Sequence, residues 1–114
     1  MHEGATTQSI IDSTLASLEE HDLAGKVIAV CVTIGVTQGM VPEAMQMFFE
    51  MQTYDTPLEG ARLEVTLQGI VGQCESCAKE FELDEAYMIC PECQGPLLMI
   101  KGKELLLTSI EVET

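Results

Sequence analysis

Basic and aromatic residues are scarce in this chain of 114 residues. Only 5 Lys and Arg stand against 19 Asp and Glu, and the formal net charge at pH 7 is −14. Such a surface repels nucleic acid phosphates and anionic lipids, which excludes both as partners and favours metal cations and basic protein surfaces. Trp is absent and aromatic residues make up 4%, so aliphatic residues and Met must form the hydrophobic core.

Long apolar runs are also absent. No stretch approaches the roughly 18 consecutive apolar residues of a membrane span. The first residues, MHEGATTQSI, lack the basic and apolar regions of a secretory signal peptide. These features predict a cytoplasmic protein, in which thiols stay reduced and paired cysteines bind metal rather than form disulfides.

Residues suited to catalysis are few. Imidazole groups come only from His2 and His21, and no glycine-rich phosphate-binding loop is present. His21 is expected at the end of a helix, where a protonated imidazole complements the helix dipole. We therefore expect that this protein is not an enzyme.

Apolar periodicity predicts two helices. Residues 7–20 carry one apolar face at helical spacing, and Thr6 or Thr7 is expected to cap the start. The second helix is expected to start at Pro42, because proline suits the first helical turn. Its predicted apolar face consists of Val41, Met45, Phe48 and Phe49.

Strands are predicted at residues 26–35, 62–68 and 104–112. The first segment is apolar at nearly every position, as in a central strand that is covered on both faces. Within it, Cys31 is interpreted as a small buried apolar residue. The second segment alternates apolar and polar residues, which is typical of a half-buried strand.

The order of these elements predicts an α+β fold with two domains. A small three-stranded sheet and two helices would form an α/β domain from residues 1–70 and 103–114. A smaller domain, residues 71–102, would be inserted before the last strand, and its four cysteines make it zinc-ribbon-like.

Four cysteines form two Cys-x2-Cys pairs, Cys74 with Cys77 and Cys90 with Cys93, separated by twelve residues. Four thiolates in two such pairs are typical of a tetrahedral Zn²⁺ site. A redox pair, an iron–sulfur cluster and disulfides fit this spacing and compartment less well. Because four protein ligands leave no open position, the predicted Zn²⁺ is structural rather than catalytic.

The first residues, Met1, His2 and Glu3, offer a different set of ligands. The α-amine, a backbone amide nitrogen and the His2 imidazole can provide nitrogen donors in one plane, which suits Ni²⁺ and Cu²⁺. Glu3 adds a carboxylate. Met1 is expected to be retained, since aminopeptidase trimming prefers a small second residue.

Several motifs in this order resemble the HypA/HybF family. They are Met-His-Glu at residues 1–3, MVPEAMQMFFE at residues 40–50, TPLEGARLEV at residues 56–65 and the two cysteine pairs. The resemblance implies transport of Ni²⁺ to [NiFe]-hydrogenase, with His2 as nickel ligand beside the Met1 amine and Glu3, and the four cysteines as zinc ligands. Implied partners are a HypB-like GTPase and the hydrogenase large-subunit precursor, and some members also contribute to urease maturation.

The chain departs from the family pattern at several positions. Val36 replaces a usual Glu, Gly4 replaces a bulky residue, and Ala78 and Gln94 follow the cysteine pairs where Gly or His is common. These changes leave both ligand sets in place. A homodimer and the alternative function, a zinc-ribbon protein–protein interaction module without nickel, stay open.

Overall fold

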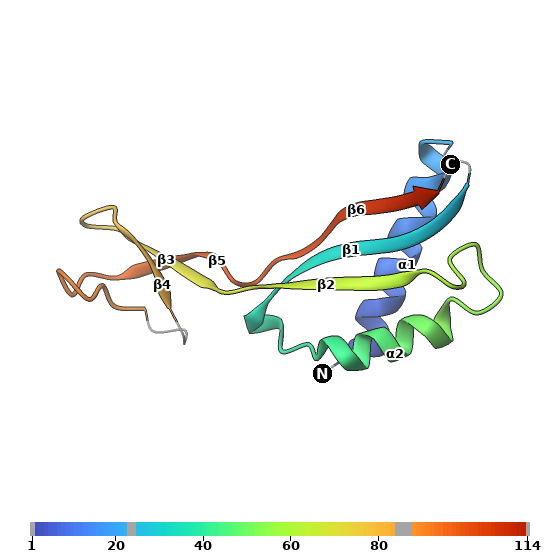
Figure 1. Ribbon diagram of the computed structural model, residues 1–114. Helices are drawn as coiled ribbons and strands as arrows, with labels where there is room; N and C mark the ends of the chain where they lie inside the picture. Colours follow the sequence, from blue (N-terminus) through green and yellow to red (C-terminus); the bar gives the residue numbers. More distant parts are fainter. Residues whose placement is uncertain (1, 23–24, 84–87, 114) are drawn as a thin grey trace. The chain divides into compact units, whose positions relative to one another are not determined.

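The computed structural model describes residues 2–22, 25–83 and 88–113 (Figure 1). The chain forms two compact units. The helical unit consists of Met1–Thr33, Gly39–Thr66 and Leu106–Thr114, and the cysteine unit of Ile34–Gln38 and Leu67–Leu105. The predicted domain limits at residues 71 and 102 stay a prediction, because compactness alone does not show which segments fold independently.

The first helix of the helical unit, α1, spans Glu3–Glu20 and so begins before the predicted residue 7. The predicted cap at Thr6 or Thr7 is wrong. The residue before the first turn is His2, at a left-handed φ of 64°, and the Thr7 side chain is fully buried. Thr7 belongs to the inward face of α1 because its spacing from Ile10, Ile11 and Thr14 is helical.

The second helix, α2, spans Pro42–Gln52 as predicted from its proline. Met45 and Phe49 are completely buried, which confirms them as core residues. Val41 is 49% exposed, so its assignment to the apolar face is wrong. The reason is that Val41 precedes the first turn in an extended conformation and lies outside the helical repeat.

The sheet of the helical unit has the strand order β2-β1-β6, with β1 at Lys26–Gly35, β2 at Arg62–Gln68 and β6 at Leu105–Glu113. α1 crosses behind the three strands (Figure 1). β1 is central, but the prediction that both its faces are covered is wrong. Ile28 is 37% exposed and Cys31 half-buried between buried neighbours, because α1 covers only one face.

The cysteine unit contains a second sheet of order β4-β3-β5, formed by Glu80–Leu83, Ile70–Cys74 and Leu97–Lys101. Both pairings are antiparallel, and Gly72 lies opposite Phe81 on one side and Met99 on the other. The sequence between the cysteine pairs is strand-like at Phe81, Leu83, Tyr87 and Ile89. Phe81 and Leu83 lie in β4, Ile89 forms an isolated bridge with Pro96, and Tyr87 lies outside the described residues.

The two helices and two three-stranded sheets confirm the α+β fold class. A short 3-10 helix, η1 (Val36–Gln38), follows β1 between Gly35 and Gly39. Among the described residues, no helix combines the length and hydropathy that a membrane span requires.

Candidate metal sites

The four paired cysteines converge at one point of the cysteine unit. Their sulfur atoms all lie within 4.8 Å of one another. Cys74 and Cys93 are 3.4 Å apart at sulfur, and Cys77 and Cys90 are 3.9 Å apart. A tetrahedral ion with Zn–S distances of ~2.3 Å separates its sulfur ligands by about 3.8 Å. The arrangement therefore fits a tetrahedral Zn²⁺ ion, and the assignment of these four cysteines as its ligands stays a prediction.

Two backbone amides favour the thiolate form of Cys74, which is the form that binds a metal ion. The amides of Ser76 and Cys77 both donate to the Cys74 sulfur at 3.4 Å. The Cys77 bond contributes most, and together the two bonds outweigh burial and lower the pKa of Cys74 to about 6. The pKa of Cys93 is instead raised to about 12, because hydrogen bonds with the thiols of Cys74 and Cys90 outweigh one from the Gly95 amide. Negative charge therefore settles first on Cys74, and a cation must displace the remaining thiol protons.

Each cysteine pair is shaped by the same turn. The amide of Ala78 donates to the Cys74 carbonyl at 3.0 Å, and the amide of Gln94 donates to the Cys90 carbonyl at 2.9 Å. Both donors adopt a left-handed backbone, with φ of 64° and 62°. Glycine adopts this conformation without strain, so Ala78 and Gln94 form these turns at a small cost.

Among the described residues of the cysteine unit, the buried apolar side chains are few: Ile34, Ile70, Cys74, Cys90 and Leu97. Its buried cluster consists of Cys74, Cys90 and Leu97. Half-buried Phe81, Leu83 and Met88 pack against the cluster. An exposed ion pair between Lys79 and Glu92, at 2.9 Å, links the two cysteine pairs but adds little stability in water. A metal ion at the four sulfurs would therefore supply much of the unit's folding free energy.

Two of the predicted nickel ligands, His2 and Glu3, lie at the start of α1. The His2 side chain is exposed. The Glu3 carboxylate accepts a hydrogen bond of 3.0 Å from the amide of Val41, directly before α2. Met1 lies outside the described residues. In the described part of the chain, neither His2 nor Glu3 belongs to a cluster of three potential ligand atoms.

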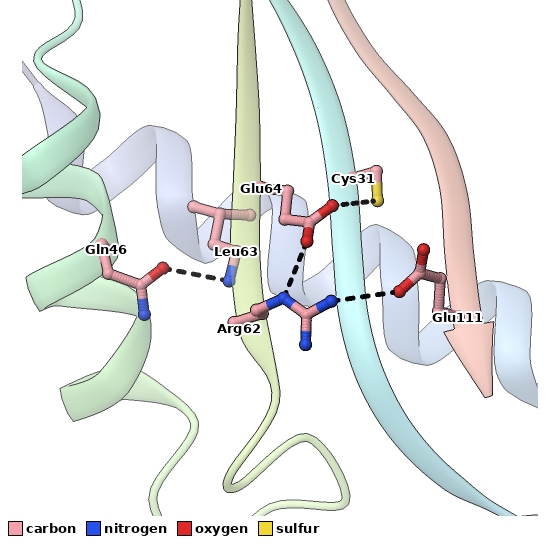
Figure 2. A network of polar contacts seen from close by, with 6 residues as sticks. All are labelled: Cys31, Gln46, Arg62, Leu63, Glu64 and Glu111. Atoms are coloured by element: carbon pink, nitrogen blue, oxygen red, sulfur yellow. Dashed lines mark hydrogen bonds and ion pairs between the residues drawn. The ribbon is translucent and has the colours of Figure 1, made fainter. Parts of the chain in front are cut away.

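A second cluster, which the sequence did not reveal, lies on the open face of the helical unit's sheet. Cys31, Glu64 and Glu111 come from three strands, and their ligand atoms lie within 4.8 Å (Figure 2). Arg62 binds both carboxylates, at 2.7 Å to Glu64 and 3.4 Å to Glu111. The single positive charge of Arg62 offsets one of the two negative charges, and the cluster is a polar network across the sheet.

The interpretation of Cys31 as a buried apolar residue is wrong. Its half-buried thiol donates to Glu64 at 3.3 Å, because the side chain lies on the face opposite α1 (Figure 2). A hydrogen bond with Ser109 lowers the pKa of this thiol. Burial and the Glu64 carboxylate together raise the pKa by more, so the net shift is upward. Cys31 therefore stays protonated. The one sequence signal for this network was the alternation of charged and apolar residues in β2.

Comparison with known proteins places these features in a family. Residues 1–112 match the family model HypA, described as "Hydrogenase/urease nickel incorporation, metallochaperone, hypA". A hydrogenase maturation factor HypA from Geobacter metallireducens is 38% identical over 115 residues, covering 99% of this chain and 100% of that protein. The HypA of Geotalea uraniireducens is 37% identical with the same coverage.

Two solved structures share the fold. The nickel metallochaperone HypA from Helicobacter pylori aligns with a TM-score of 0.69 over 98% of this chain and 97% of its own, at 23% identity. A second HypA structure aligns with a TM-score of 0.73 over 99% and 97%, again at 23% identity. Because the family model matches residues 1–112 and the relatives align over their full length, this chain belongs to the HypA family of hydrogenase maturation factors and nickel metallochaperones.

Proposed function

We propose that this protein carries Ni²⁺ to a [NiFe]-hydrogenase large-subunit precursor in cooperation with a HypB-like GTPase. The observation that supports this most is the match of residues 1–112 to a family described by nickel incorporation. Relatives of nearly equal length are named hydrogenase maturation factors. In this proposal Ni²⁺ is cargo, the protein has no catalytic role, and it acts in the cytoplasm.

The proposed nickel ligands are the Met1 amine, the His2 imidazole and backbone nitrogen, and Glu3. The exposure of His2 supports this assignment, since a delivered ion must enter and leave without unfolding. The bond from the Val41 amide to Glu3 fixes the start of α1 against the start of α2. Nitrogen donors of this kind bind Cu²⁺ more tightly than Ni²⁺, so selectivity has to come from metal supply and from docking to the right partner.

The proposed zinc ligands are Cys74, Cys77, Cys90 and Cys93. The sulfur separations of 3.4 and 3.9 Å and the small surrounding core both support a structural ion. Four thiolates close the coordination shell and leave no position for a substrate or water. Zinc would therefore stabilise the cysteine unit and take no part in delivery chemistry.

The nickel site is tested by calorimetric titration of the zinc-loaded protein with Ni²⁺. The native chain is compared with one that carries an extra residue before Met1, which displaces the amine, and with His2→Ala. We expect the native chain to bind about one Ni²⁺ per chain and both variants to lose most of the affinity, because the donors act as one chelate.

His21→Ala is the matched control. This residue is the second imidazole of the chain, and its Nδ1 lies 2.9 Å from the Ser17 carbonyl at the end of α1. Nickel binding should be unchanged in this variant. Equal binding by the native and extended chains would refute the nickel assignment, and the protein would then be better described as a zinc-stabilised interaction module.

A further inference from the structure

The outer face of α2 carries large apolar side chains that the fold leaves exposed. Met47 is 54% exposed and Met51, one helical turn later, is 57% exposed. Tyr54, just beyond the end of the helix, is 77% exposed. These three residues are called the α2 stripe. A solvent-facing helix surface is normally polar, so a line of large apolar side chains indicates a contact surface.

The inner side of α2 accounts for the packing of the helix without the stripe. Met45 and Phe49 are fully buried in the helical unit. Gln46 accepts a 3.0 Å hydrogen bond from the Leu63 amide of β2, which Figure 2 shows. Gln52 donates to the Gly4 carbonyl of α1 at 3.1 Å. Because these contacts hold the helix from within, the α2 stripe is free to bind another molecule.

The charged residues near the α2 stripe in the sequence are all acidic. No Lys or Arg occurs between Lys26 and Arg62. The acidic residues of this interval are all exposed: Glu43, Glu50, Asp55 and Glu59. An apolar line with acidic flanks is complementary to a protein surface with an apolar centre and a rim of Lys and Arg. It is repelled by nucleic acids and anionic membranes.

We propose that the α2 stripe is a docking site for a partner protein with such a surface. The proposal rests on the function proposed above, since the partner is taken to be one that exchanges Ni²⁺ with this chain. Glu3 binds the amide of Val41, and Gln52 binds Gly4, so α2 is joined to the start of α1 at two points. Docking on α2 therefore holds the partner on the helix to which Glu3 and Gly4, the two residues that follow His2, are hydrogen-bonded. Methionine suits this role because its side chain is flexible and polarisable.

Binding of two purified probes tests the docking site: the HypB-like GTPase and the hydrogenase large-subunit precursor of the same organism. The double variant Met47→Gln/Met51→Gln keeps helix-forming side chains but removes the apolar stripe. We expect its Kd for one of the two probes to rise about tenfold or more, as for truncated contact residues at the centre of an interface. Calorimetry with zinc-loaded full-length chain measures this change.

Leu98→Gln is the matched control, since Leu98 is 58% exposed on β5 of the cysteine unit. Its Kd should equal that of the unchanged chain. Unchanged binding by the double variant, an equal loss in Leu98→Gln, or failure of both probes to bind the unchanged chain would overturn the proposal.

The acidic flank is tested by Glu43→Gln/Glu50→Gln, with Glu19→Gln/Glu20→Gln on α1 as control. Only the first pair should weaken probe binding at low salt and flatten its salt dependence, because rim charges mainly act through the screened field. If the Kd of the two double variants depended equally on salt, the proposal of a partner with a rim of Lys and Arg would be overturned.

Two further measurements separate this proposal from its alternatives. Sedimentation of the Met47→Gln/Met51→Gln chain should match that of the unchanged chain. Dissociation of a dimer in this variant would show that the occupant is a second copy, and would overturn the proposal. Nickel titration of the same variant should be normal, so a failed nickel site and a failed docking site give different results.

Discussion

At Gly35 there is no room for a single methyl group. A Cβ atom there would lie 2.1 Å from both the carbonyl carbon and the oxygen of Gly102. The two segments are also hydrogen-bonded, since the Gly35 amide donates to Glu104 at 2.8 Å and the Thr37 amide to Gly102 at 3.0 Å. From the sequence, Gly35 indicated only the end of a strand. Its contact with a residue far along the chain emerges in the folded cysteine unit.

Gly35→Ala should therefore destabilise the cysteine unit. The backbone of Gly102 must shift to admit the methyl group, and overpacking of this kind costs about 1–3 kcal/mol. Amide hydrogen exchange should accelerate at Gly35 and Thr37. Gly69→Ala is the control, because a Cβ atom at Gly69 meets nothing within 4 Å. Similar exchange rates in the two variants would contradict the clash.

At the scale of the element, α2 shows how much of a helix the hydrophobic pattern of the sequence can predict. The sequence predicted its start at Pro42 and the core positions Met45 and Phe49, because proline and helical spacing are local properties. It did not separate the buried face from an exposed apolar one. Met47 and Met51 are as apolar as the buried Met45, so the sequence pattern does not distinguish them. The positions of the sheet and of α1 decide which methionines are exposed to solvent.

Substitutions on the two faces of α2 should differ sharply in effect. Phe49 is 0% exposed, and Phe49→Ala should lower the free energy of unfolding by about 3–5 kcal/mol through loss of burial and a cavity. Met51 is 57% exposed, and Met51→Ala should change it by no more than about 0.5 kcal/mol. Urea unfolding followed by circular dichroism at 222 nm measures both. Losses of equal size would mean that the stripe is part of the core.

At the scale of the whole molecule, we expect the two units to depend on different sources of stability. The helical unit contains both helices and most of the buried aliphatic residues. In the cysteine unit, two of the three residues of the buried cluster are cysteines, Cys74 and Cys90. A strand-rich unit with so small a core depends on a cross-link or a metal for its stability.

Removal of zinc should therefore unfold the cysteine unit selectively. After chelation we expect loss of amide protection in residues 70–74 and 97–101, while the helical signal at 222 nm persists. Cys77→Ser/Cys93→Ser should reproduce this state without chelator, because two thiolate ligands are lost. Cys31→Ser, the same substitution outside the cluster, should leave the zinc content at about one ion per chain. A cysteine unit that stays protected without metal would contradict the structural role of zinc.

Local chemistry in the sequence by itself determined the fold class, the order of helices and strands in the helical unit and the grouping of the four paired cysteines. Spacing within a Cys-x2-Cys pair and a proline at a first turn act over a few residues, and so they can be read directly. The tertiary structure decided which face of each element is buried. In it, Thr7 lies on the buried face of α1, the Cys31 thiol donates to Glu64 on the open face of the sheet, and Met47 and Met51 are exposed. Burial depends on which segments pack together, and residues distant in the chain become neighbours only through folding.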